Sequence, residues 1–147
     1  MKIQNSLKHL FVSQTRIKII NVLFYNPGEI YYVRQLVRLV DEEINSVRRE
    51  LDNLQKSGLI TSEWRGNRLY YWADKQSTLF SNLLIIANQS SGLGLKLQNK
   101  NETLGSIKLV FYNYKFMTGE KRQTDDIDLV VVGDVSIREI ENLIKQE

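Results

Sequence analysis

The 147-residue sequence contains no cysteine, one histidine and one proline, and it lacks any long apolar run. Without cysteine, and with His9 as the single histidine, the chain cannot form a zinc finger, an iron–sulfur cluster or a cysteine nucleophile. A membrane helix needs about 18 consecutive apolar residues, and no segment approaches that length. Residues 1–10 also lack the apolar stretch of a secretory signal. We therefore expect a cytoplasmic protein without a membrane partner.

The composition is that of an ordinary globular protein, with 42% hydrophobic and 25% charged residues. This length allows one domain or two small ones. The net charge of +3 is unevenly distributed: residues 1–75 carry 12 Lys/Arg against 8 Asp/Glu, whereas residues 76–147 carry 8 against 9. The basic first half indicates an anionic partner.

Apolar residues three and four positions apart predict helices over 13–25, 33–40 and 41–58. Ser13 and Asp41 are expected to cap the first and the third of these helices. Pro27 next to Gly28 ends the first helix in a turn. Gly58 provides the left-handed residue that commonly follows a helix, here the third. The second and third helices therefore meet across a tight turn.

After Gly58 the apolar pattern changes to that of strands. Segments 59–64 and 69–73 are rich in aromatic and aliphatic residues and flank a basic tip at 65–68, which predicts a β-hairpin. A fourth amphipathic helix is expected over 79–87. Three helices followed by such a hairpin have the outline of a winged helix-turn-helix.

The second half of the sequence combines strands with a final helix. Residues 88–103 are polar, contain glycine and show weak periodicity, which favours a domain boundary there. Strands are predicted at 107–112 and 126–132, and the β-branched run of the latter is typical of a sheet covered on both faces. Ser136 and Glu139 predict a capping box for the last helix. The expected fold is α+β, with a winged-helix domain over 1–90, a connecting segment over 91–103 and a small αβ unit over 104–147.

The third predicted helix carries side chains of the types that bind DNA. With Val47 and Leu51 facing inward, its polar and basic residues face outward. Arginine recognises guanine, asparagine recognises adenine, and both bind phosphate, as do lysine and serine. The hairpin tip and the start of the second helix add further contacts, although a solvated helix face is the alternative for any single charge. The candidate DNA-binding residues are Asn45, Ser46, Arg48, Arg49, Asn53, Lys56, Arg65, Asn67, Arg68, Tyr32 and Arg34.

Residues 11–80 resemble the winged-helix domains of ArsR-like transcriptional regulators, most clearly in VRRELDNLQKSGLI and in RGNRLYYW. The resemblance implies a DNA-binding transcriptional regulator that acts as a homodimer on a palindromic site. The cysteines of the arsenic-responsive members are absent, so metal sensing is not implied. We expect the dimer surface to use the apolar residues Leu10, Phe11, Leu79, Phe80, Leu83 and Leu84.

Asp126 and Asp128 lie two positions apart in a predicted strand, so both carboxylates would point to the same face. Two carboxylates on one face can share a Mg²⁺ ion that also holds a nucleoside triphosphate. A solvated strand end is the alternative for this pair. Asp126 and Asp128 are therefore a candidate weak magnesium site, and no other cofactor is predicted.

The run IKLVFYNYKFMTGEKRQTDDIDLVVVGD, residues 107–134, resembles the minimal nucleotidyltransferase core. Gly119, Glu120, Asp126 and Asp128 match that pattern. In this family a Gly-Ser pair opens a helix whose backbone amides approach the triphosphate. The resemblance thus implies a nucleotidyltransferase-like C-terminal unit.

Two departures from the family pattern predict that this unit is inactive. Tyr114 and Lys115 stand where the family has Gly-Ser, and a tyrosine side chain would obstruct the triphosphate, although Lys115 offers a compensating charge. In the family the third carboxylate comes from a later strand, whereas the residues that follow Asp128 here are taken up by Gly133, Asp134 and the last helix. We therefore assign no catalytic residues and favour a DNA-binding regulator. A metal-dependent nucleotidyltransferase targeted by its winged helix is the alternative, and a C-terminal unit that serves only as an interaction surface is a third hypothesis.

Overall fold

The computed structural model describes residues 12–99, 101–121 and 123–145. The protein is α+β, with helices and two small antiparallel sheets. Within these ranges no helix is long and apolar enough to cross a membrane. The elements in chain order are α2 (Gln14–Tyr25), β1 (Tyr31–Tyr32), α3 (Val33–Val40), α4 (Ile44–Lys56), β2 (Ile60–Arg65), β3 (Arg68–Ala73), α5 (Phe80–Ser90), α6 (Gly92–Asn99), α7 (Asn101–Leu104), β4 (Gly105–Tyr112), α8 (Tyr114–Thr118), β5 (Leu129–Val135) and α9 (Ile137–Ile144).

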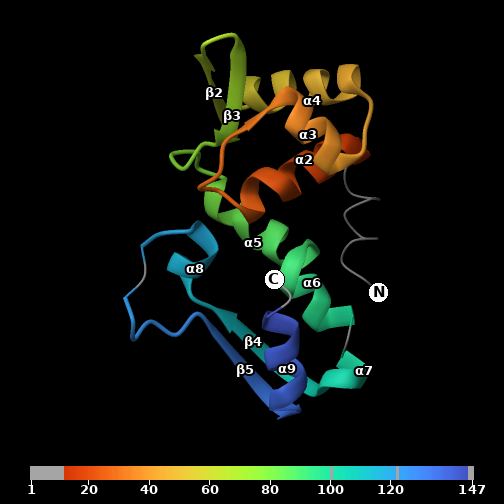
Figure 1. Cartoon of the computed structure of the whole chain (residues 1–147), viewed down its shortest axis with the longest axis vertical. Helices are drawn as coiled ribbons and strands as arrows, with labels where there is room; N and C mark the ends of the chain where they lie inside the picture. Colours follow the sequence, from red (N-terminus) through yellow and green to blue (C-terminus); the bar gives the residue numbers. More distant parts are fainter. Residues whose placement is uncertain (1–11, 100, 122, 146–147) are drawn as a thin grey trace.

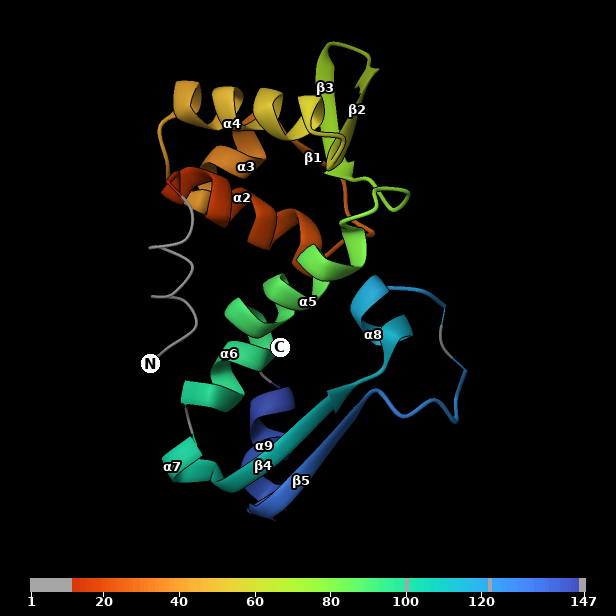
Figure 2. The same ribbon diagram turned by 180° about the vertical axis from the view of Figure 1, so that it is seen from behind.

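The two sheets lie at opposite ends of an elongated molecule. Figure 1 shows α2, α3 and α4 with the first sheet at one end, and β4, β5 and α9 at the other. Helices α5 and α6 run between the two ends, and Figure 2 shows the same arrangement from behind. Short helix α8 returns from the second sheet to contact α5. Helix α5 therefore touches both parts of the molecule.

The predicted N-terminal helices are confirmed as α2, α3 and α4. The Ser13 hydroxyl caps α2 as expected, and Gly58 has a φ of 65° directly after α4 ends. These helices bury one continuous core whose fully enclosed members include Phe24, Leu36 and Leu51. The apolar stripes read from the sequence are thus the faces that pack together.

The prediction that Asp41 caps the third helix is wrong. Asp41 has a φ of 50° and ends α3, because its backbone N–H donates to the Val37 carbonyl. Glu43 caps α4 instead, and its Oε2 accepts hydrogen bonds from the backbone N–H groups of Asn45 at 2.8 Å and Ser46 at 3.1 Å. The positive end of the α4 dipole is therefore neutralised by a carboxylate of the chain itself.

The predicted hairpin is confirmed, and a third strand joins it. Strands β2 and β3 pair from Ile60 opposite Ala73 to Arg65 opposite Arg68, which leaves two residues at the tip. Strand β1 pairs with the other edge of β3, giving the order β1-β3-β2. This pairing fixes the start of α3 beside the hairpin, since β1 leads directly into α3.

A buried ion pair fixes α4 against α2. Arg16 Nε donates to Glu50 Oε2 at 2.8 Å, and the Glu50 side chain is only 4% exposed. Burial alone would raise the pKa of the Glu50 carboxyl. Hydrogen bonds from Arg16, Ser13 and Asn53, together with the charge of Arg16, outweigh burial and hold this pKa below its ordinary value. The carboxylate is therefore ionised at neutral pH.

Replacing Glu50 by glutamine is expected to lower the free energy of unfolding by about 1–2 kcal/mol near neutral pH, because a charge-assisted hydrogen bond becomes a neutral one. A lowered folded-state pKa stabilises the fold above the ordinary carboxyl pKa, and this stabilisation is lost as the pH falls through the lowered value. The difference between parent and variant should therefore be smaller at an acidic pH than at neutral pH. Urea unfolding at both pH values measures it. The same replacement at Glu63, 57% exposed in its pair with Arg65, should have little effect at either pH.

The predicted boundary segment 88–103 is helical where the structure describes it, at the end of α5 and in α6 and α7. Leu93, Leu97 and Leu104 are buried from this segment and form a second core with Leu143 of α9. Polar residues and glycines stand between these leucines, so the helical spacing of apolar residues in this segment is weak. The final helix is confirmed as α9, where the Ser136 hydroxyl accepts the N–H of Glu139 at 3.4 Å.

The strand predicted at 107–112 is confirmed within β4, but the prediction of a strand from Asp126 is wrong. Strand β5 begins at Leu129, which pairs with Tyr112, the last residue of β4. Asn113 then starts the turn into α8, so no partner strand exists beyond that point for 126–128. Asn113 instead donates hydrogen bonds to the Ile127 and Asp128 carbonyls. Asp126 and Asp128 thus lie in the loop that leads into β5.

The expectation of a sheet covered on both faces is also wrong. One face of the β4–β5 sheet packs on the second core, through residues such as Ile107, Val110 and Leu129. The opposite face is open to solvent and carries two cross-strand apolar pairs. These pairs are Leu109 with Val132 and Phe111 with Val130, each residue at least 41% exposed. We call these four residues the open sheet face.

The expected dimer surface is largely unavailable on α5. Phe80, Leu83 and Leu84 are at most 8% exposed, because α5 packs against α2 and the Phe80 ring lies 5.9 Å from that of Phe24. Leu79 alone among the predicted residues of this helix is exposed, at 51%. Leu10 and Phe11, the other predicted residues, lie outside the described residues.

Candidate nucleic-acid interface

A groove of about 700 Å³ lies between α3, α4 and the hairpin. It brings together five of the predicted DNA-binding residues, which come from three separate segments of the chain. These residues are Tyr32, Arg34, Arg48, Asn67 and Arg68. The antiparallel pairing of β1 with β3 places the start of α3 next to the hairpin, and the packing of α3 on α4 adds Arg48.

The groove is lined by guanidinium groups that form no ion pair within the described part of the chain. Arg34, Arg38 and Arg48 are all exposed, and no ion pair joins any of them to a carboxylate of the described residues. The Arg68 guanidinium lies 4.8 Å from the centre of the Tyr32 ring, a cation–π distance that holds it at the rim. This cluster of positive charge can accept phosphate or carboxylate ligands.

The Tyr71 hydroxyl adds a neutral donor to this groove. Burial, followed by the nearby Asp52 carboxylate, raises the pKa of Tyr71 above its ordinary value, and Arg48 only partly offsets this. The phenol is therefore protonated at neutral pH, and Tyr71 lines the groove as a neutral group.

The remaining basic candidates lie outside the groove and have partners within the chain. Lys56 Nζ lies 2.6 Å from Asp52 Oδ2, one helical turn earlier. Arg65 Nε lies 2.9 Å from Glu63 Oε2, and its guanidinium also lies near the Tyr70 and Trp72 rings. These pairs weaken the positive charge on their side of α4 and on the outer hairpin strand.

The other α4 candidates differ in availability. Arg49 is 69% exposed, and its Nε lies 3.9 Å from Glu50 Oε1, so it remains able to reach a ligand. Asn53 hydrogen-bonds to the Glu50 carboxylate and therefore serves the fold. Asn45 is exposed and Ser46 partly so, next to the Glu43 carboxylate that caps the helix.

Comparisons with family models, with curated proteins and with solved structures found no match to this chain. The residues themselves must therefore carry any functional argument.

Two exposed residues of the groove, Arg38 and Trp64, were missed from the sequence. Arg38 follows Arg34 by four positions on α3 and shares its outward face, so the same helical spacing that placed Leu36 and Val40 inside would have found it. Trp64 on β2 is 67% exposed and lines the groove, although a tryptophan in a strand pattern normally indicates the core. An exposed tryptophan beside arginines is a feature of binding surfaces.

The candidate magnesium pair lies in a separate hollow of about 530 Å³, lined also by Glu120 and Gln123. Asp126 Oδ2 accepts the backbone N–H of Gln123 at 2.9 Å and lies 3.3 Å from Lys115 Nζ. The ammonium group thus stands where a cation would approach Asp126. In the part of the chain that the structure describes, no group of three or more histidine, aspartate or glutamate side chains is arranged to hold a metal ion.

The segment that aligns with the Gly-Ser pair is occupied by the protein's own groups. The Asn113 side-chain oxygen accepts the backbone N–H of Lys115 at 2.9 Å, so this amide is not directed at a ligand. Tyr114 is 49% exposed beside it. Neither the backbone amide nor the charge of Lys115 is therefore available to a triphosphate without rearrangement.

Proposed function

We propose that this chain is a DNA-binding transcriptional regulator that reads duplex DNA through a winged helix built from α2, α3, α4 and the β2–β3 hairpin. The observation that carries the proposal is the groove in which Arg34, Arg38 and Arg48 converge beside the hairpin tip without neutralising partners among the described residues. Clustered, uncompensated arginines on one face are the electrostatic footprint of a nucleic-acid-binding protein.

In this proposal α4 is the recognition helix and the other segments position it. The exposed side chains of Arg48, Arg49 and Asn45 face the major groove, where arginine and asparagine read guanine and adenine edges. Arg34 on α3 and Arg68 at the hairpin bind phosphates on either side of α4. A helix flanked by two phosphate-binding segments matches a duplex better than it matches an acidic peptide, which lacks a regular backbone of negative charge.

A single small domain makes few base contacts, so we propose that two copies act together on a palindromic site. Half-sites about one helical turn apart, roughly 34 Å, would give one recognition helix to each successive major groove. The C-terminal unit is then a nucleotidyltransferase-like appendage without catalytic activity. The contact between Lys115 and Asp126 supports inactivity, because the ammonium competes with a metal ion for that carboxylate.

Salt dependence of duplex binding tests this proposal. The affinity of the full chain for a fluorescent 30-base-pair duplex of random sequence, measured by anisotropy, should fall with salt with a log–log slope of about −3 to −4, since four groove arginines release about 0.9 counterions each. A slope near zero, or no binding at low salt, would contradict the proposal. Magnesium-dependent pyrophosphate release from nucleoside triphosphates, lost in D126N/D128N, would favour the nucleotidyltransferase alternative instead.

A further inference from the structure

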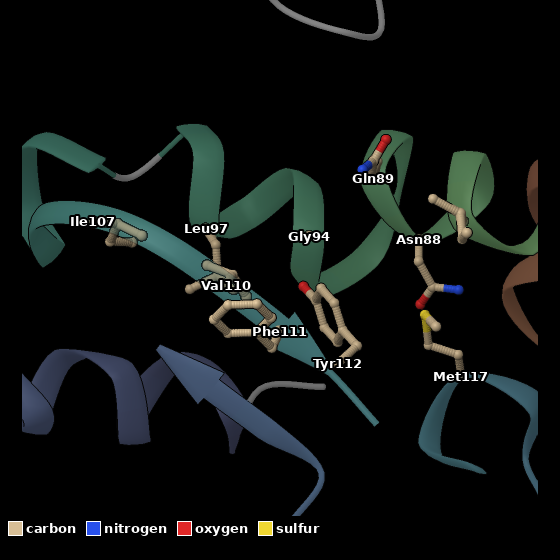
Figure 3. Close-up of a pocket in the computed structure, with 10 residues that line it drawn as sticks. Asn88, Gln89, Gly94, Leu97, Ile107, Val110, Phe111, Tyr112 and Met117 are labelled. Atoms are coloured by element: carbon tan, nitrogen blue, oxygen red, sulfur yellow. The ribbon is translucent and has the colours of Figure 1, made fainter. Parts of the chain in front are cut away.

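A cavity of about 480 Å³ lies at the junction between the two parts of the molecule, where α5, α6, β4 and α8 meet. Figure 3 shows Leu97 and Gly94 of α6 on one side, Val110 and Tyr112 of β4 on the other, and Asn88 and Met117 at one end. The cavity lies on the covered side of the sheet, away from both the arginine groove and the aspartate hollow.

One wall of the cavity is formed where α6 packs closely against the end of α5. A Cβ at Gly94 would collide with the Asn88 carbonyl oxygen, so α6 passes against the end of α5 only because this residue is glycine. The Tyr112 hydroxyl points toward Gly94 from the opposite wall (Figure 3). The two helices therefore enclose the cavity from one side while the strand closes the other.

The cavity wall is largely apolar and carries no charged side chain. Its apolar members include Ile85, Leu97, Ile107, Val110 and Met117, and its polar side chains are amides and a phenol. A charged molecule would lose its hydration here without gaining an ion pair. The volume falls within the range of about 300–1,000 Å³ that small-molecule sites occupy. The wall therefore selects a neutral, mostly apolar molecule.

One polar side chain, that of Asn88, can orient a molecule bound in the cavity. Asn88 is only 5% exposed, and its Nδ2 donates to the Leu84 carbonyl at 2.9 Å. In Figure 3 the amide oxygen points the other way, toward Met117 at the end of the cavity, and it accepts no hydrogen bond from the described residues. The oxygen therefore faces the cavity, where a bound N–H or O–H group can donate a hydrogen bond to it.

We propose that this cavity binds a neutral, mostly apolar small molecule that donates one hydrogen bond to Asn88 Oδ1. The molecule packs its apolar body between Leu97 and Val110. It bridges α5, which belongs to the first core, and β4, which belongs to the second. This proposal does not depend on DNA binding and is tested by a separate ligand-binding measurement.

N-phenyl-1-naphthylamine is a suitable probe, because it is neutral, fluoresces in apolar surroundings and has a single N–H group. Titrated into the full chain, it should bind saturably with one site per chain. N88L keeps the volume but removes the acceptor, and it should weaken binding about 5-fold, as expected for one neutral hydrogen bond. V110W fills the cavity and should abolish saturable binding.

Two controls keep the result specific. N82L makes the same replacement at an exposed position of α5 outside the cavity, and L109T/V132T makes the open sheet face more polar; both should bind the probe as the parent does. I85W, at a rim position that is 46% exposed, blocks entry should V110W fail to fold by circular dichroism. The absence of saturable binding, equal affinity in N88L, retained binding in the cavity-filling variant, or loss of binding in L109T/V132T would each overturn the proposal.

Discussion

The triple variant R34Q/R38Q/R48Q is expected to bind a random-sequence duplex at least about a hundredfold more weakly than the parent at moderate salt, because three charge-assisted contacts of about 1 kcal/mol or more are lost. The magnitude of the salt slope should fall by about 2.7, which leaves a slope of about −1 from Arg68. The fold should be unaffected, since the three side chains are exposed and form no ion pair with the described residues. Anisotropy titrations at several salt concentrations provide both numbers.

A variant with the same net charge separates the groove from general attraction. K108Q/R138Q/K145Q removes three exposed positive charges from the β4 and α9 end of the molecule. Its affinity should stay within a few-fold of the parent, because those charges lie far from the groove along the long axis (Figure 1). Equal losses in the two triple variants would show that the groove is not the contact surface.

Replacing Phe24 by alanine should lower the free energy of unfolding by about 3–5 kcal/mol, the range for deleting a fully enclosed aromatic side chain. Phe24 is 0% exposed in the first core, and its ring lies 5.9 Å from that of Phe80. The cavity left behind would separate α2 from α5, the helix that connects the two parts of the molecule. Urea unfolding followed by far-UV circular dichroism measures the change.

Phe111 provides the matched control for this experiment, since F111A deletes the same atoms from a residue that is 55% exposed on the open sheet face. We expect a loss below about 1 kcal/mol, because most of this ring is already in water. Comparable losses of unfolding free energy at the two positions would mean that Phe111 and the open sheet face are covered in solution.

The sequence predicted the first part of the molecule well because its signals are local. Helices α2, α3 and α4 follow from apolar residues three and four positions apart, and the hairpin follows from two aromatic-rich runs around Gly66. The predicted cap of α4 was Asp41 rather than Glu43, because aspartate is a preferred N-cap residue and glutamate is not. The left-handed backbone at Asp41 instead ends α3 and leaves Glu43 to cap α4.

The second part was predicted less well because its elements depend on contacts distant in sequence. Strand β5 starts at Leu129 because its partner strand β4 ends at Tyr112. The residues around Asp126 carry no signal of where that partner strand ends. Similarly, each of the five groove residues was predicted from the sequence as a single candidate. Only the structure shows that Arg34 and Arg48 lack ion-pair partners among the described residues, and that Lys56 pairs with Asp52. Charge types can be read from a sequence, whereas their neutralisation cannot.

The open sheet face gives the protein opposite responses to ionic strength at its two ends. Salt screens the arginine groove and weakens its attraction for anions, while exposed apolar side chains such as Leu109 and Val130 become less soluble as salt is added. Among the described residues, each strand of this sheet is paired along one edge only, which favours strand-to-strand association between molecules. In salt titrations of the proposed DNA complex, the samples at high salt are therefore also the most prone to self-association. Light scattering at each salt concentration is needed to distinguish dissociation of the complex from precipitation.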